Sequence, residues 1–276
     1  MQQEWLRERR DLFLKNIVKD FFECLAFFED LKEHTTKYGV RYDGFDFWVG
    51  TEENKGKLWI LKDLCHLIWG DDNLQEDDEG VMFDWMVGAI FHEAMKLKEN
   101  AYMFERYRES FPHKATAILN GNSTKVVKEF FEEMIVEIKR CIKRLEWLFS
   151  HAKKHLFQVM KKEKDNALLV RFLLEDISNN GKEKIKSSQE TKKLLKSLFP
   201  EGLHSAYCLA GESYLEGGWF QEARNAFEKA LLLKSDCIDA RSGLRLLEKR
   251  LKELASFVNR EYELLQRNNK QKGLKS

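Results

Sequence analysis

The chain has 276 residues, of which 43% are apolar and 34% are charged. This length is sufficient for one large or two medium domains, each with its own hydrophobic core. The 47 basic and 46 acidic side chains nearly cancel, so the net charge of +1 gives no general attraction to nucleic acid or to an anionic membrane. No nucleic-acid partner is therefore expected.

The proline and cysteine content predicts the fold class and the cellular location of the protein. Only Pro112 and Pro200 occur, and neither interrupts an apolar periodic stretch, so the sequence predicts an all-α fold. The five cysteines are widely spaced and include no CxxC pair, which predicts reduced thiols and a cytoplasmic location. The N-terminus is charged where a secretory signal would be apolar, and no stretch approaches the length of a membrane span, so no membrane association is expected.

The first part of the chain predicts a helical bundle. Apolar residues recur at helical spacing over residues 3–32, and further helices are expected over 55–69 and 80–111. Between the first two helices lies YGVRYDGFDFWVG, whose aromatic and glycine residues hold no helical period. This segment predicts an ordered loop or a short pair of strands.

The clearest periodicity follows the polar sequence NGNST, in which Asn122 or Ser123 offers an N-cap. From Val127 to Ala152 the apolar residues alternate in steps of four and three, which is a heptad seam. Additional apolar residues widen this seam, so the helix is expected to pack into an antiparallel bundle or hairpin.

A composition change suggests the domain boundary. A shorter helix is expected over residues 165–177, and it is followed by the lysine-rich stretch 181–193, GKEKIKSSQETKK. Polar, lysine-rich composition is typical of a linker. The predicted domains are a helical bundle over residues 1–180 and a second helical domain over residues 181–276.

Five ionisable residues suggest a metal site. Steps of eight and seven residues bring Asp84, His92 and Glu99 to one sector of a helix, and Asp63 and His66 lie three apart on the preceding helix. Carboxylates and imidazoles from neighbouring helices are how a bundle holds iron, manganese or zinc. A metal-holding bundle is therefore one hypothesis. The favoured alternative is a structural role, since only Asp63 and His66 approach the paired pattern of ferritin-like proteins, and no cofactor is expected.

Other histidines give weaker patterns. His151 and His155 lie four apart, but neighbouring lysines would repel a cation, so a structural role is expected. Arg108–His113 and Arg144–His151 fit the permissive arginine–histidine spacing of HEPN ribonucleases, in which the histidine serves as acid or base. The chain has no Gly-rich phosphate loop, GxSxG elbow or HExxH motif, so no catalytic residue is predicted.

The most specific pattern spans residues 204–237. Aromatic and small residues alternate there in the order Tyr207, Gly211, Tyr214, Ala223, Phe227 and Ala230. This order resembles a tetratricopeptide repeat, in which two antiparallel helices are joined by a turn, here at Gly217-Gly218. Ala210 and Ser235 depart from the family pattern, which usually has leucine and proline at these positions. The resemblance implies a helical hairpin.

The resemblance also implies a protein-binding function. In this family the inner face of the first helix lines a concave surface, and the corresponding residues here are Ser205, Cys208, Glu212, Leu215 and Glu216. They lack the basic side chains with which some repeats clamp a C-terminal carboxylate, so the expected ligand is basic or apolar. The predicted function is a cytoplasmic adaptor or scaffold that binds a partner protein or peptide. In the alternative, the chain's own C-terminal helix fills the groove.

A last helix is expected over residues 238–265. Arg245 and Glu248 stand where a second repeat would need a small and an aromatic residue. A capping helix is therefore predicted, because the end of a repeat otherwise exposes its apolar face. Its seam can alternatively pair between chains to form a homodimer; the seam consists of Leu244, Leu247, Leu251, Leu254 and Val258.

Overall fold

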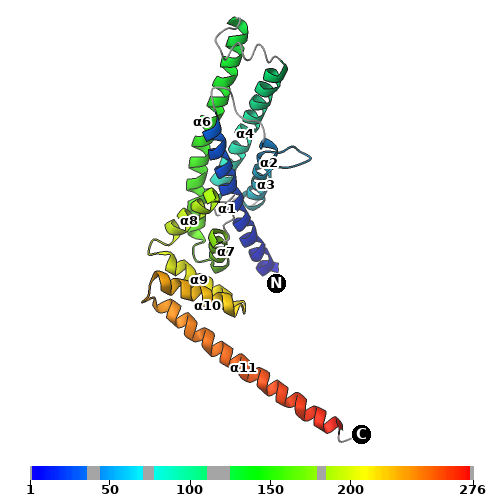
Figure 1. Ribbon diagram of the computed structural model, residues 1–276, viewed down its shortest axis with the longest axis vertical. Helices are drawn as coiled ribbons and strands as arrows, with labels where there is room; N and C mark the ends of the chain where they lie inside the picture. Colours follow the sequence, from blue (N-terminus) through cyan, green and yellow to red (C-terminus); the bar gives the residue numbers. More distant parts are fainter. Residues whose placement is uncertain (1, 36–43, 71–77, 111–124, 179–184, 274–276) are drawn as a thin grey trace. The chain divides into compact units, whose positions relative to one another are not determined.

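The computed structural model describes residues 2–35, 44–70, 78–110, 125–178 and 185–273. Within these ranges the chain is almost wholly α-helical and forms no strand, which confirms the all-α prediction (Figure 1). An isolated antiparallel bridge joins Gly50 and Lys55. No helix in the described ranges has an apolar stretch long enough to cross a membrane.

The chain divides into two compact units whose sequences interleave. Unit 1 contains Met1–Glu163 and Asp176–Leu198, and unit 2 contains Lys164–Glu175 and Phe199–Ser276. Composition alone suggested one boundary near residue 180. The two units instead alternate along the chain, and each is described separately below.

Unit 1 is a helical bundle. The long helices α4 and α6 lie side by side (Figure 1), and α1 packs against α3 and α8. The helices are α1 (Gln2–His34), α2 (Phe45–Trp48), α3 (Lys57–Trp69), α4 (Asp78–Ser110), α6 (Lys125–Lys162) and α8 (Ile185–Leu198).

An aromatic cluster joins four of these helices. Phe149 of α6 stacks on Phe28 of α1 with the ring centroids 5.1 Å apart, and on Trp48 of α2 at 6.5 Å. Phe21 of α1 contacts Phe149 and also meets Phe83 of α4 edge-on. All five side chains are buried. Because each aromatic side chain removes a large apolar area from water, this cluster is the centre of the core of unit 1.

Most of the described seam of α6 is buried, and Met134 and Leu148 are half-buried. Phe131, Ile138, Leu145 and Ala152 are all buried, and Phe131 meets Phe104 of α4 edge-on at 5.2 Å. The helix therefore pairs with α4, which is the hairpin arrangement expected from its wide apolar stripe. The proposed N-cap residues of α6 lie outside the described residues.

The glycine-rich segment before residue 50 contains a short helix in its described part, where a loop or strands were expected. Gly44 precedes α2 with φ of +104°, a conformation that other residues rarely adopt. Phe45 and Trp48 then turn into the core, and the amide of Trp48 donates to the carbonyl of Gly44 at 3.0 Å. Burial of the two aromatic side chains decides this local structure.

The linker predicted over residues 181–193 is wrong in its second part, because α8 begins at Ile185. Lys192, Lys193 and Lys196 are exposed, whereas Thr191, Leu194 and Leu195 are buried. The Thr191 hydroxyl also donates to Asp176 at 3.1 Å. The composition of the stretch suggested a linker because its buried residues, Ser187, Ser188 and Thr191, are small and polar and do not stand out from the lysines of the exposed face.

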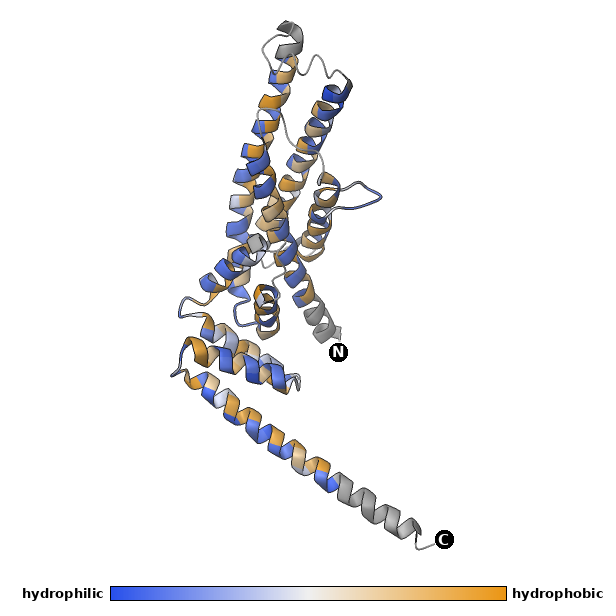
Figure 2. Ribbon diagram, viewed as in Figure 1, coloured by the Kyte–Doolittle hydropathy of each residue, from blue (hydrophilic) through white to orange (hydrophobic). Residues whose placement is uncertain are grey.

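Unit 2 consists of a helical hairpin, part of a preceding helix and a long final helix. Helices α9 and α10 pack against each other, and the first half of α11 packs against both. Apolar and polar residues alternate along α11 (Figure 2). The helices are α7 (Ala167–Ser178, in unit 2 as far as Glu175), α9 (Leu203–Glu216), α10 (Phe220–Leu233) and α11 (Ile238–Gly273).

Replacing Phe149 tests the aromatic core. Phe149 is 1% exposed, so we expect Phe149→Ala to leave a cavity and to lower the free energy of unfolding by about 3–5 kcal/mol. Phe47 is 59% exposed and serves as the control, with an expected cost for Phe47→Ala below about 1 kcal/mol. Urea denaturation of both variants measures the difference, and equal costs would contradict the assignment of the core.

Candidate partner-binding surface

The residues that carry the repeat resemblance form the core of the α9–α10 hairpin. Phe227 of α10 is fully buried between Gly211 of α9 and Gly243 of α11. A Cβ atom at Gly211 would lie 2.6 Å from the Phe227 ring, and one at Gly243 would also clash with it. Ala223 and Ala230 are buried in the same cluster. Small residues on two helices therefore make the space that one aromatic ring fills.

The turn between α9 and α10 is fixed by glycine. Gly218 has φ of +77°, and its amide donates to the carbonyl of Leu215 at 3.3 Å. The next amide, of Trp219, donates to the carbonyl of Tyr214 at 2.8 Å. These two bonds are the Schellman arrangement that ends a helix at a left-handed residue. The predicted turn at Gly217-Gly218 thus has a defined geometry.

Helix α7 contacts the α9–α10 hairpin at Tyr214. The Tyr214 hydroxyl donates to a carboxylate oxygen of Glu175 at 2.5 Å, and the Arg171 guanidinium lies 4.9 Å from the centre of the Tyr214 ring. Burial, followed by the hydrogen bond to Glu175, raises the pKa of Tyr214 above its ordinary value. This contact explains why a polar aromatic residue suits the position.

Helix α11 covers the apolar part of the predicted inner face. Cys208 and Leu215 are buried in the cluster that includes α11, and Ser205 is half-buried. Glu212 and Glu216 remain exposed. The C-terminal helix thus packs over the apolar residues of the predicted inner face and leaves its two glutamates exposed.

Three carboxylates form what we call the acidic edge, defined by Glu212 and Glu216 of α9 and Asp239 of α11. The pKa of Glu212 is raised, first by burial and then by the negative charges of Asp239 and Glu216. Within the described residues, no basic side chain forms an ion pair with any of the three. The repeat pattern does not include Asp239 because this residue belongs to the next helix, although an acid in the first turn of a helix is a recognisable signal.

The described side chains of α11 become exposed beyond Leu251. An Arg250 side chain donates to the carbonyl of Leu215 at 3.1 Å, and Leu251 still packs against the hairpin cluster. From Lys252 to Arg260 every residue is exposed. Leu254 and Phe257, 46% and 60% exposed, continue the apolar stripe along this stretch.

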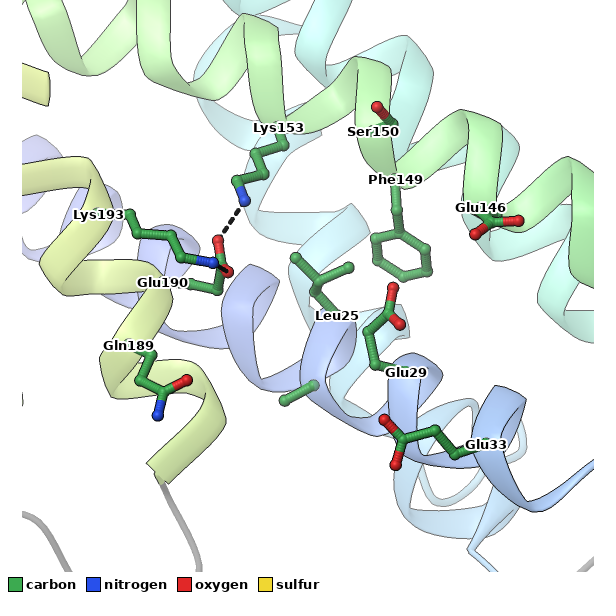
Figure 3. A pocket seen from close by; sticks show the side chains of 11 residues that line it. Leu25, Glu29, Glu33, Glu146, Phe149, Ser150, Lys153, Gln189, Glu190 and Lys193 are labelled. Atoms are coloured by element: carbon green, nitrogen blue, oxygen red, sulfur yellow. Dashed lines mark hydrogen bonds and ion pairs between the residues drawn. The ribbon is translucent and has the colours of Figure 1, made fainter.

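Unit 1 contains a groove that the sequence did not suggest. It lies between α1, α6 and α8 and has a volume of about 610 Å³ (Figure 3). Leu25 and Phe149 give it an apolar floor, and the carboxylates of Glu29, Glu33 and Glu146 line one end. The residues come from three helices far apart in sequence, so no local pattern could reveal the groove.

Lysines offset part of the charge of this groove. Lys32 of α1 bridges to α6, with its Nζ 3.1 Å from the Glu146 carboxylate. At the other end Lys153 and Lys193 both pair with Glu190 (Figure 3). Burial favours the protonated form of Glu190, but the bonds to the two lysines outweigh it and lower the pKa. Four carboxylates and two lysines line the groove, so its lining keeps a net negative charge.

The five candidate metal ligands do not form a metal site. His66 and Asp84 approach each other, with Nδ1 3.5 Å from Oδ2, but Asp63 pairs with a lysine instead, and His92 and Glu99 are exposed. No group of three or more His, Cys, Asp or Glu in the described part is arranged to hold a metal ion. The reason is axial distance, because residues seven or eight apart share a helix face but lie about 10–12 Å apart along it.

The remaining histidine and arginine candidates contact structural neighbours. Arg144 lies 3.6 Å from a buried glutamate of α4, and the His155 Nδ1 lies 2.6 Å from another α4 carboxylate. His151 stacks on Trp147, and its Nδ1 lies 2.8 Å from the Trp147 carbonyl oxygen. His113 lies outside the described residues. These contacts agree with the structural role expected for His151 and His155.

Enlarging Gly211 tests the three-helix contact. Because a side chain there would clash with the Phe227 ring, we expect Gly211→Leu to cost about 1–3 kcal/mol or more in unfolding free energy. Gly88 of α4 is a matched helical control, since no atom lies within 4 Å of an added Cβ. Thermal denaturation should show a loss for Gly211→Leu and no loss for Gly88→Leu; a melt unchanged at Gly211 would reject the contact.

The raised pKa of Glu212 predicts a pH-dependent stability effect. The folded state disfavours the charged carboxylate, so this group stabilises the fold when it is protonated and loses that contribution as the pH rises through its folded-state pKa. We therefore expect Glu212→Gln to raise the melting temperature at pH 7. This gain in melting temperature should shrink as the pH falls below the ordinary pKa range of a glutamate carboxyl. A gain that stays constant with pH would exclude this electrostatic origin.

No family model, curated protein or solved structure matches the chain. The likeness to a tetratricopeptide repeat therefore rests on the residues of α9 and α10 and on their packing.

Proposed function

We propose that the chain is an adaptor of the tetratricopeptide type that binds a basic segment of a partner protein at its acidic edge. One observation carries the proposal: Glu216 and Asp239 are close enough to raise the pKa of Glu212, and none of the three carboxylates forms an ion pair with a described basic side chain. A protein surface that keeps like charges together in this way favours a ligand of opposite charge.

The electrostatics of the edge indicate how such a ligand would bind. An ammonium or guanidinium group placed between the carboxylates would favour their charged forms and so lower the pKa of Glu212. Charge-assisted hydrogen bonds of this kind are stronger than neutral ones, and arginine can make two at once. Because the edge is exposed, salt should weaken the interaction.

The packing of unit 2 supports a preformed binding surface. Glu212 directly follows Gly211, and Asp239 lies one turn before Gly243, so the carboxylates sit beside the Phe227 contact. Helix α7 further holds α9 through Tyr214. A ligand therefore does not have to order these helices when it binds, which reduces the entropic cost of association.

We also place this adaptor in the cytoplasm, because all five cysteines are free thiols. Homodimerisation through the exposed stripe of α11 is a second use of unit 2 and is compatible with partner binding. Light scattering would reveal it directly.

Charge reversal tests the acidic edge. An array of peptides with basic, neutral and acidic sequences in equal numbers is probed with wild type, with Glu212→Lys/Glu216→Lys and with the control Glu222→Lys/Glu228→Lys. The control pair is exposed on α10 and changes the net charge by the same amount. We expect wild type and control to select basic peptides, and the Glu212/Glu216 variant to bind them on the order of 10-fold more weakly.

Two results would reject the proposal. If both double variants bind basic peptides equally more weakly than wild type, the effect comes from net charge and not from a local site. Selection of acidic or neutral peptides by wild type would show that the edge does not choose the ligand. Circular dichroism of all three proteins establishes that the folds are comparable.

A further inference from the structure

Two cysteines of unit 2 meet in space although 29 positions separate them in the sequence. Cys208 lies on α9, and Cys237 lies in the corner just before α11 begins at Ile238. Their Sγ atoms are 3.5 Å apart, and each residue is 5% exposed. The thiol of Cys141 provides a contrast, because its polar neighbours are the Asn100 amide, with nitrogen and sulfur 4.0 Å apart, and the Glu93 carboxylate.

We propose that Cys208 and Cys237 are a redox-active dithiol that a peroxide converts into a disulfide linking α9 to the start of α11. In the first step one thiolate attacks a peroxide oxygen, the O–O bond breaks, and a sulfenic acid and water form. In the second step the other thiol attacks the sulfenic sulfur, the S–S bond forms, and the S–O bond breaks with release of a second water. The two sulfurs lose two electrons and two protons, and hydrogen peroxide is reduced to two waters.

The surroundings disfavour the thiolate of Cys208. Its pKa is raised to about 12 by burial, then by the contact with Cys237 and then by the charges of Asp239 and Glu212. Since the thiolate is the reactive form, Cys208 is a poor first target. Once either thiol is oxidised, the other lies 3.5 Å away and can close the disulfide.

The local backbone permits the closure. The sulfurs must approach by about 1.5 Å to reach disulfide bonding distance. Cys237 lies outside both neighbouring helices, so its backbone can adjust without loss of a helical turn. The closed loop contains all of α10, so the bond would fasten the capping helix to the hairpin. By loop-closure entropy this should raise the melting temperature of unit 2 on the order of 10 °C.

The experiment uses the full chain and hydrogen peroxide. Reduced wild-type protein is oxidised, its remaining thiols are blocked, and it is digested without reductant for mass spectrometry. We expect a cross-linked peptide pair that contains Cys208 and Cys237, together with a rise in melting temperature that dithiothreitol reverses. The Cys141→Ala variant should show both the cross-linked peptide pair and the rise in melting temperature. The Cys237→Ala variant should show neither. In Cys208→Ala, a sulfenic-acid trapping reagent should label Cys237.

The outcomes decide the proposal. It is overturned if oxidised wild type keeps both thiols, carries sulfinic acid at either one without a cross-link, or links Cys208 or Cys237 to another chain. If the cross-link forms and the melting temperature stays unchanged, the claim that the disulfide stabilises the contact of α11 with the hairpin is rejected. The wild-type measurements need no substitution, so misfolding of a variant would not prevent the test. None of these results depends on the peptide preference of the acidic edge.

Discussion

Unit 2 depends on the contact between Phe227 and two glycines. The ring fills a space shared by α9, α10 and α11, and that space exists only because Gly211 and Gly243 lack side chains. Close packing of this kind tolerates little change in shape. Since Glu212 follows Gly211 directly, the same contact sets where the carboxylates of the acidic edge lie. Packing in the interior thus positions the surface that we propose binds a partner.

The sequence predicted those parts of the fold whose stabilising contacts recur along one helix. The seam of α6 is an example, because a repeat of seven residues identifies the buried face wherever the partner helix lies. The short helix α2 could not be predicted in this way, since Phe45 and Trp48 are buried and Trp48 meets aromatic rings of α1 and α6. Helix α8 was misread because the stretch 181–193 is polar and lysine-rich, and the residues of it that are buried, Ser187, Ser188 and Thr191, are themselves polar. Local composition does not distinguish an exposed face from a linker.

The candidate site shows the same limit. The resemblance to a repeat placed Glu212 and Glu216 on an exposed face, and both are exposed in the structure. Asp239 was missed, as was the proximity of Cys208 to Cys237, because each depends on where α11 begins relative to α9. The candidate metal ligands lie apart for a related reason, since a shared helix sector fixes direction around the axis but not distance along it. Contacts between helices therefore require the three-dimensional arrangement.

The two halves of α11 have different surroundings but one continuous backbone. Forming the first turn of a helix in water is unfavourable by about 4 kcal/mol, whereas each later residue adds at little cost. The turns from Ile238 to Leu251 are held by the hairpin, so they supply the nucleus for everything beyond. Propagation from this nucleus lets the exposed stretch with Leu254 and Phe257 hold its helical form without a partner of its own. The apolar side chains of this stretch are thereby held at fixed positions along an already formed helix.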